Sequence, residues 1–133
     1  MTEPQALKEE GLRHYRQGSF DEAIACFVEA HSLCLKREDQ HGAAEVLNNL
    51  GVIYYQQERW SEAAEALEKA YQAFIAMQDR DGQAQALGNL GGLYRASGQL
   101  EKAARHFKDA LPLFHQLHSL YKLGYISPMF ETF

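Results

Sequence analysis

Two histidines near the end of the chain have the spacing of a metal site. His115 and His118 are three residues apart, which places both on one face of a helix, and His106 lies nine residues before His115. A catalytic metal site also needs a third ligand and an open coordination position. Nearby carboxylates such as Asp109 share no helical face with the pair. We therefore predict no metal and no cofactor here.

The two cysteines are the next candidates for chemistry. Cys26 and Cys34 are eight residues apart on one expected helix, so a rise of about 1.5 Å per residue separates their Cα atoms by about 12 Å. A disulfide requires about 4.4–6.8 Å, and we expect buried, reduced thiols in a reducing compartment. The sequence has no nucleophile with a matched base, no phosphate-binding loop and no paired-cysteine motif, which predicts a non-catalytic protein.

Asparagine and tyrosine residues recur at helical spacing and point to peptide binding. Asn carries a donor and an acceptor that can pair with the backbone of an extended chain, and Tyr offers a flat apolar surface with a polar tip. Gly88 and Gly92 leave bare backbone on the same face, which is either a slot for a partner chain or only a weak helix. The alternative for the whole stripe is a merely solvated polar face. The predicted peptide-binding residues are Lys8, Leu12, Tyr15, Arg16, Asn48, Asn49, Val52, Tyr55, Gln85, Asn89, Gly92 and Arg95.

A pattern that occurs three times, with a period of 40 residues, positions these side chains. In the clearest copy, 47–70, small and apolar residues follow helical spacing, a polar break interrupts them, and a second helical pattern follows. Each copy therefore predicts a hairpin of two helices. The small residues Gly11, Gly51 and Gly91 of the first helices, faced by Ala23, Ala63 and Ala103 of the second, should allow the two helices to approach closely. The matching positions are Leu7, Gly11, Ala23, Phe27 and Ala30 in the first copy, Leu47, Leu50, Gly51, Tyr54, Ala63, Leu67 and Ala70 in the second, and Leu87, Leu90, Gly91, Tyr94, Ala103, Phe107 and Ala110 in the third.

This pattern resembles the tetratricopeptide repeat, whose signature is W-x2-L-G-x2-Y followed by A-x3-F. The second and third copies carry Leu-x2-Leu-Gly-x2-Tyr at 47–54 and 87–94, and the first and third carry Ala-x3-Phe. The first copy departs from the signature, since Glu10 replaces the leucine and His14 the tyrosine, as expected of a terminal repeat whose outer side faces water. The period is longer than the usual 34 residues of the family, which implies longer second helices or longer connections between repeats.

The resemblance implies an all-α solenoid of three helical hairpins, six antiparallel helices in all, followed by a short apolar tail or capping helix. The first helices should line the concave side. We expect one domain with Ser61 capping the fourth helix. The expected repeats are at about 4–39, 40–79 and 80–117 with a tail at 118–133, and the expected helices are at about 4–17, 21–36, 43–57, 61–77, 83–96 and 100–117.

Two comparisons within the family bear on the ligand. Asn49 and Asn89 occupy matching positions that resemble the peptide-holding asparagines of members with long repeats. One subfamily grips the C-terminal carboxylate of chaperones with a clamp of lysine, asparagine and arginine side chains, and Lys8 and Asn49 match two of its positions. The other three positions are Leu12, Gln85 and Asn89 here, so most of the charge that such a clamp needs is missing. We do not expect chaperone tails as ligands.

The tail after residue 117 is too apolar for a solvated terminus. It is predicted to cap the third repeat, to pack on a second copy of the chain in a homo-oligomer, or to be disordered. The residues that would form this cap or self-association surface are Leu120, Tyr121, Tyr125, Ile126, Met129, Phe130 and Phe133.

Composition bounds the class of partner. The 133 residues include 13 Lys and Arg against 18 Asp and Glu, a net charge of −5, which opposes binding to nucleic acid. No apolar run approaches the ~18 residues of a membrane span, and the first residues lack the features of a signal peptide. We expect a cytoplasmic protein without a membrane span that binds a protein or peptide segment. The alternative is a self-assembly module that uses its apolar tail.

Overall fold

All regular elements that the computed structural model describes are α-helices. It describes residues 3–99, 102, 105 and 108–109, and five complete helices lie within them, in agreement with the all-α expectation. Of the sixth expected helix, 100–117, the four described residues are helical, and the remainder lies outside the described residues, as does the expected tail at 118–133. The helices are α1 (Pro4–Arg16), α2 (Phe20–Lys36), α3 (Gln40–Gln56), α4 (Trp60–Ala76) and α5 (Arg80–Ala96).

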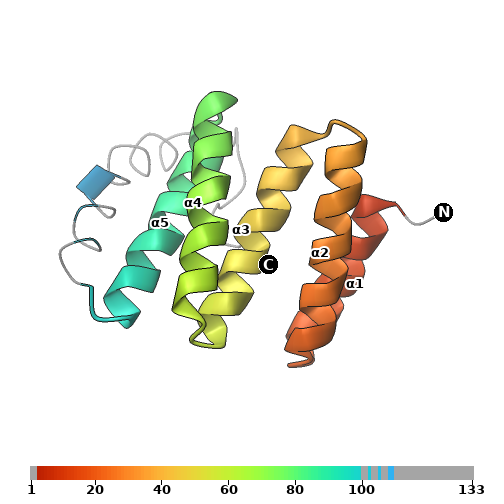
Figure 1. The fold of residues 1–133 in the computed structure, drawn as a ribbon, viewed down its shortest axis with the longest axis horizontal. Coiled ribbons are helices and arrows are strands. Elements are labelled where there is room, and N and C mark those ends of the chain that lie inside the picture. Colours follow the sequence, from red (N-terminus) through yellow and green to blue (C-terminus); the bar gives the residue numbers. More distant parts are fainter. Residues whose placement is uncertain (1–2, 100–101, 103–104, 106–107, 110–133) are drawn as a thin grey trace, which may run out of the picture.

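The helices follow one another across the molecule in chain order, from α1 to α5 (Figure 1). Each helix packs against the next one along the chain, and in Figure 1 α2 lies in front of α1 and α4 in front of α5. The first and second helices of the hairpins thus form two layers. α3 and α5, the first helices of repeats two and three, also contact each other directly, as expected for the inner side of a curved stack.

The 40-residue period has a simple structural origin. The helices α2, α3, α4 and α5 have 17 residues each, and the connections 37–39, 57–59 and 77–79 that join them have three residues each. The period implied longer second helices or longer connections, and the short connections exclude the second of these explanations. The extra length lies in the helices, and in repeat two the first helix is as long as the second.

Every connection ends its helix in the same way. The middle residue has a positive φ, and the next N–H donates to a carbonyl five residues back, as from Arg59 to Tyr54 at 2.9 Å. This is the hydrogen-bond pattern of a Schellman motif, in which glycine is the usual left-handed residue. Two of the five connections have glycine there and three do not. The residues with positive φ are Gly18, Glu38, Glu58, Gln78 and Gly98.

Two aspartates start helices three residues earlier than predicted. The side chains of Asp39 and Asp79 precede α3 and α5 and accept hydrogen bonds from the backbone N–H groups of Gly42 at 2.9 Å and Gly82 at 3.1 Å. Asp is among the best N-cap residues. The same Asp-x-x-Gly sequence at a 40-residue offset was a signal for both starts.

The predicted cap on α4 is wrong. Ser61 lies inside the helix, which begins at Trp60, and the N-cap residue Arg59 makes no side-chain capping bond. The Trp60 ring instead packs edge-on against Tyr55, with 5.9 Å between ring centroids. This ring contact lies at the hairpin corner, where α4 begins.

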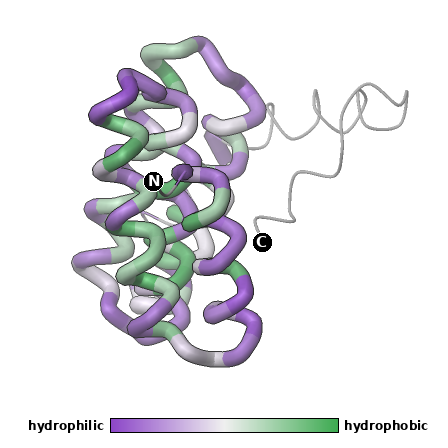
Figure 2. Tube along the Cα trace, turned by 90° about the vertical axis from the view of Figure 1, so that its right-hand side faces the viewer, coloured by the Kyte–Doolittle hydropathy of each residue, from purple (hydrophilic) through white to green (hydrophobic). Residues whose placement is uncertain are grey.

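Two glycines allow the helices of a hairpin to approach closely, as predicted. A Cβ on Gly51 would lie 2.4 Å from Leu67 Cγ, and one on Gly11 would lie 2.9 Å from Phe27 Cε2. The closest facing residues are thus Leu67 and Phe27, and not the alanines four residues before them, which were predicted to face the glycines. Hydrophobic residues alternate with hydrophilic ones along the helices (Figure 2), and the buried ones form clusters that join successive helices. Among the described helices, none has the length and apolar character of a membrane span.

Candidate binding groove

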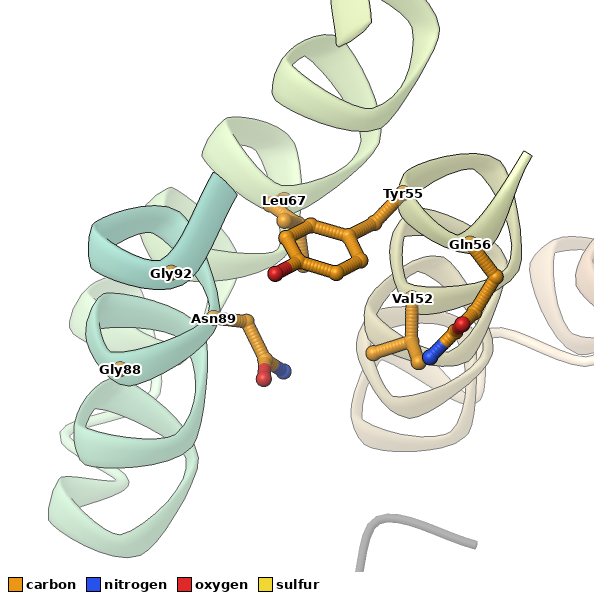
Figure 3. Close-up of a pocket in the computed structure, with 7 residues that line it drawn as sticks. All are labelled: Val52, Tyr55, Gln56, Leu67, Gly88, Asn89 and Gly92. Atoms are coloured by element: carbon orange, nitrogen blue, oxygen red, sulfur yellow. The ribbon is translucent and has the colours of Figure 1, made fainter. Parts of the chain in front are cut away.

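A pocket of about 220 Å³ opens between the first helices of repeats two and three (Figure 3). It has one wall on α3 and one on α5, and a leucine of α4 lies behind them. Four predicted peptide-binding residues, Val52, Tyr55, Asn89 and Gly92, meet here. The complete lining is Val52, Tyr55, Gln56, Leu67, Gly88, Asn89 and Gly92.

The two glycines of α5 shape this pocket. Gly88 and Gly92 lie inside the continuous helix, one turn apart, and both belong to the lining. A Cβ on Gly92 would have its nearest neighbour among the described residues at 4.0 Å, on the ring of Tyr55. Tyr55 extends from α3 toward α5 in Figure 3. One wall of the pocket is therefore bare backbone, and the other carries an aromatic ring.

The predicted asparagines have different environments. Asn89 Nδ2 donates a hydrogen bond of 3.0 Å to Asn48 Oδ1, which ties α5 to α3. Asn48 is only 2% exposed and Asn49 only 7%. Of the three, only Asn89 lines the pocket, and Asn48 contributes to the contact between α3 and α5.

The predicted residues of α1 lie away from this pocket. Leu12 and Tyr15 pack against the core cluster of repeats one and two, and Arg16 is exposed. Lys8 Nζ lies 3.6 Å from Glu45 Oε1 and lines a second, polar pocket of about 290 Å³. Lys8 is paired and Asn49 is buried, so the two residues that match the chaperone-tail clamp are not presented together.

The remaining two predicted residues are on α5 but outside the pocket lining. Gln85 is half-buried and Arg95 is exposed. The structure thus gathers one third of the predicted set, and adds Gln56, Leu67 and Gly88 to it. Leu67 was missed because it lies on a second helix, where we expected only core residues.

A charged cluster lies where α3 meets the start of α5. His41 Nδ1 is 3.3 Å from Glu45 Oε1, and its Nε2 is 3.0 Å from Asp79 Oδ2. Burial, and then the charge of Asp79, raise the pKa of Asp81. Its Oδ1 atom is buried without a hydrogen-bond partner among the described residues. The ionised form of Asp81 therefore lowers the stability of the contact between α3 and α5.

Neither cysteine belongs to the lining of the pocket between α3 and α5. Cys34 is buried, Cys26 is half-buried, and both are free thiols, whose pKa values are raised by burial. Of the predicted histidine group, His106, His115 and His118 lie outside the described residues.

Comparisons with known proteins agree with the observed architecture. A family model described as "Tetratricopeptide repeat" matches residues 6–76, more than half of the chain, and a second one with the same description matches residues 83–119. The N-terminal domain of stress-induced protein-1 (STI-1) from C. elegans has a similar structure, with a TM-score of 0.72 at 21% identity over 91% of this chain and 94% of that chain. At this identity the likeness shows the fold alone. A search of curated proteins found no match.

Proposed function

Because the chain belongs to the tetratricopeptide repeat family, we propose that it is a non-catalytic scaffold that binds a segment of another protein between α3 and α5. Domains of this family generally mediate protein–protein interactions. The observation that carries the proposal is the pocket of about 220 Å³ between these helices, with glycine backbone on one side and Tyr55 on the other.

The lining favours an apolar side chain on an extended segment. Val52 and the ring of Tyr55 supply apolar surface in front of the buried Leu67, and Gln56 and Asn89 supply amide groups. Because Asn89 donates one of its two Nδ2 hydrogens to Asn48, its side-chain carbonyl oxygen is left to accept from the backbone N–H of a bound segment. The volume is below the ~300–1,000 Å³ of most small-molecule sites, which favours one side chain of a longer ligand.

Two finer predictions remain open. Homo-oligomerisation through residues 118–133 depends on residues outside the described part of the chain, and no observation on the described residues favours it over peptide binding. We also propose a cytoplasmic location, which the two free thiols support.

The test uses a displayed library of random 15-residue peptides, selected on the full chain. Enriched peptides are labelled, and their Kd is measured by fluorescence anisotropy for the wild type and for Gly92→Leu. Since a Cβ at position 92 meets nothing closer than 4.0 Å, the leucine should fit and occupy the pocket. We expect binding at least about tenfold weaker, which corresponds to ~1.4 kcal/mol.

Ala25→Leu is the control. Ala25 is an exposed residue of α2, and the substitution introduces a leucine, as Gly92→Leu does. Circular dichroism should show both variants folded. Peptides that bind Gly92→Leu as tightly as the wild type would rule out this pocket as the binding site.

A further inference from the structure

Repeat one differs from repeat two at three positions that meet in the fold. The three residues of repeat one are all of types that bind metal ions, whereas their counterparts in repeat two are apolar or aromatic. Those counterparts lie together and line one pocket on repeat two. The pairs at an offset of 40 residues are Glu10 and Leu50, His14 and Tyr54, and Cys26 and Ala66.

The three side chains of repeat one converge between two helices. Glu10 and His14 are one turn apart on α1, with Glu10 Oε1 3.7 Å from His14 Nε2, and Cys26 approaches them from α2. A carboxylate oxygen, an imidazole nitrogen and the sulfur all lie within 4.8 Å of one another. No other group of three His, Cys, Asp or Glu in the described part of the chain was found to meet this condition.

These distances are close to those of a metal site. Ligand atoms around a tetrahedral Zn²⁺ with bonds of about 2.0–2.3 Å lie about 3.5 Å apart. The required closure is about 1 Å. Glu10 can adjust its distances to the other two ligand atoms by a change of rotamer, because its side chain is 45% exposed.

An uncovered terminal repeat explains only part of this pattern. Facing water accounts for a glutamate and a histidine at positions that are apolar in the next repeat. It does not account for Cys26, because cysteine is among the most buried residue types and solvates poorly. A cysteine next to a carboxylate and an imidazole is, by contrast, a ligand set that suits zinc.

We propose that Glu10, His14 and Cys26 bind Zn²⁺ or a similar thiophilic divalent cation, with water as the fourth ligand. The ion links α1 to α2, and so fastens the two helices of the first hairpin to each other. One carboxylate and one thiolate balance the two positive charges, which leaves this partly buried site neutral. The site lies in repeat one and shares no residue with the pocket between α3 and α5.

Binding is coupled to release of one proton. Only the thiolate form of a cysteine binds a metal ion, so the Cys26 thiol loses its proton when the ion binds. The ion takes the place of this proton, which passes to solvent. Arg13 competes weakly for Glu10, because the pair is 3.9 Å apart and both side chains are largely exposed.

The test uses the full, reduced, metal-free chain with Co²⁺ as the spectroscopic probe. We expect one Co²⁺ per chain, a thiolate-to-cobalt absorption band in the near ultraviolet, and displacement of Co²⁺ by Zn²⁺. Cys26→Ala, which introduces the residue of repeat two, should abolish the band. Cys34→Ala changes the other cysteine and should retain it.

Two further variants test the remaining ligands. Glu10→Gln and His14→Gln should each weaken Zn²⁺ binding, measured by calorimetry, at least about tenfold. Removal of a residue that only hydrogen-bonds to a ligand can already cost this much affinity, so removal of a ligand should cost no less. Zn²⁺ should raise the Tm of the wild type and leave that of Cys26→Ala unchanged. The proposal is wrong if millimolar Co²⁺ produces no band, or if Cys26→Ala binds either ion like the wild type.

Discussion

Repeats one and two form the same hairpin, but they differ on the side that carries Glu10 in repeat one and Leu50 in repeat two. Among the described residues, repeat one covers this side of repeat two, and no other repeat covers it in repeat one. Leu50 and Ala66 are 5% and 7% exposed and pack in one cluster with the core of repeat one. Glu10, the counterpart of Leu50, has a side chain that is 45% exposed. The two repeats thus carry residues of opposite polarity at equivalent positions of the same backbone fold. Whether a neighbouring repeat covers the position decides which polarity is tolerated there.

Inside the hairpins the two repeats agree. Gly11 and Gly51 are each overlaid by a large side chain of the second helix, and both of those side chains, Phe27 and Leu67, are 0% exposed. Positions that pack within a hairpin therefore keep their character, whereas positions between hairpins depend on what lies beside them. Seven substitutions, in decreasing order of expected effect, test how position within the array sets the effect of a residue.

The largest effect is expected when a residue of repeat one is placed in repeat two. Leu50→Glu buries a carboxylate without a partner against the core, which should lower the free energy of unfolding by about 3–5 kcal/mol. Urea denaturation followed by circular dichroism measures this loss. The reverse change, Glu10→Leu, should alter stability by less than about 1 kcal/mol, and similar losses for the two would contradict the comparison.

The next effect concerns the close approach within a hairpin. Gly51→Ala places a Cβ 2.4 Å from Leu67 Cγ, and overpacking of this kind costs about 1–3 kcal/mol. Gly11→Ala should cost less, because its Cβ would lie 2.9 Å from the edge of the Phe27 ring. Thermal unfolding of both variants ranks the two sites; the opposite order would show that repeat one is the more tightly packed.

A smaller effect on stability is expected at the turns between helices. Glu58 has a φ of 59° at the position where its counterpart in repeat one, Gly18, has 77°. Since a left-handed backbone costs a residue with a Cβ about 1–2 kcal/mol, Glu58→Gly should raise stability by about 1 kcal/mol and Gly18→Ala should lower it by about as much. Urea titration should show shifted midpoints with unchanged slopes. Destabilisation by Glu58→Gly would mean that the glutamate side chain matters more than its backbone.

The smallest effect is expected at the junction of repeats two and three. The folded pKa of Asp81 is raised by burial and by Asp79, so its ionised form costs stability at neutral pH, and the cost disappears as the pH falls through the folded pKa. Asp81→Asn should therefore be more stable than the wild type at pH 7, and the gain should shrink toward pH 4. The urea midpoints of both proteins across this pH range measure this gain in stability. A gain that stays constant with pH would show that it has a cause other than the ionisation of Asp81.

Helix starts show what local sequence predicts and what it misses. Polar breaks located every helix of the described part to within about three residues. The Asp39 and Asp79 caps were missed because the flanking polar residues looked like linker, although both side chains bond within their own segment. They were in principle predictable, because a cap depends only on residues that are neighbours in the chain.

The groove was only partly predictable. Helical spacing assigned Val52, Tyr55, Asn89 and Gly92 to one side, and the structure brings them to one pocket. The same spacing assigned Asn48 to the exposed stripe, yet it is 2% exposed. Periodicity describes the face of a single helix, but exposure depends on how closely the next helix packs, and here the α3–α5 contact covers Asn48.

The sequence by itself determined the repeat, its period, the hairpins and the glycines at their crossings, because these features depend on spacing along one or two neighbouring helices. Only the tertiary structure decided that Leu67 and not Ala63 overlies Gly51, and that Glu10, His14 and Cys26 meet between α1 and α2. Such encounters are set by side-chain packing between separate helices, and no periodicity along either helix records the rotation of one against the other.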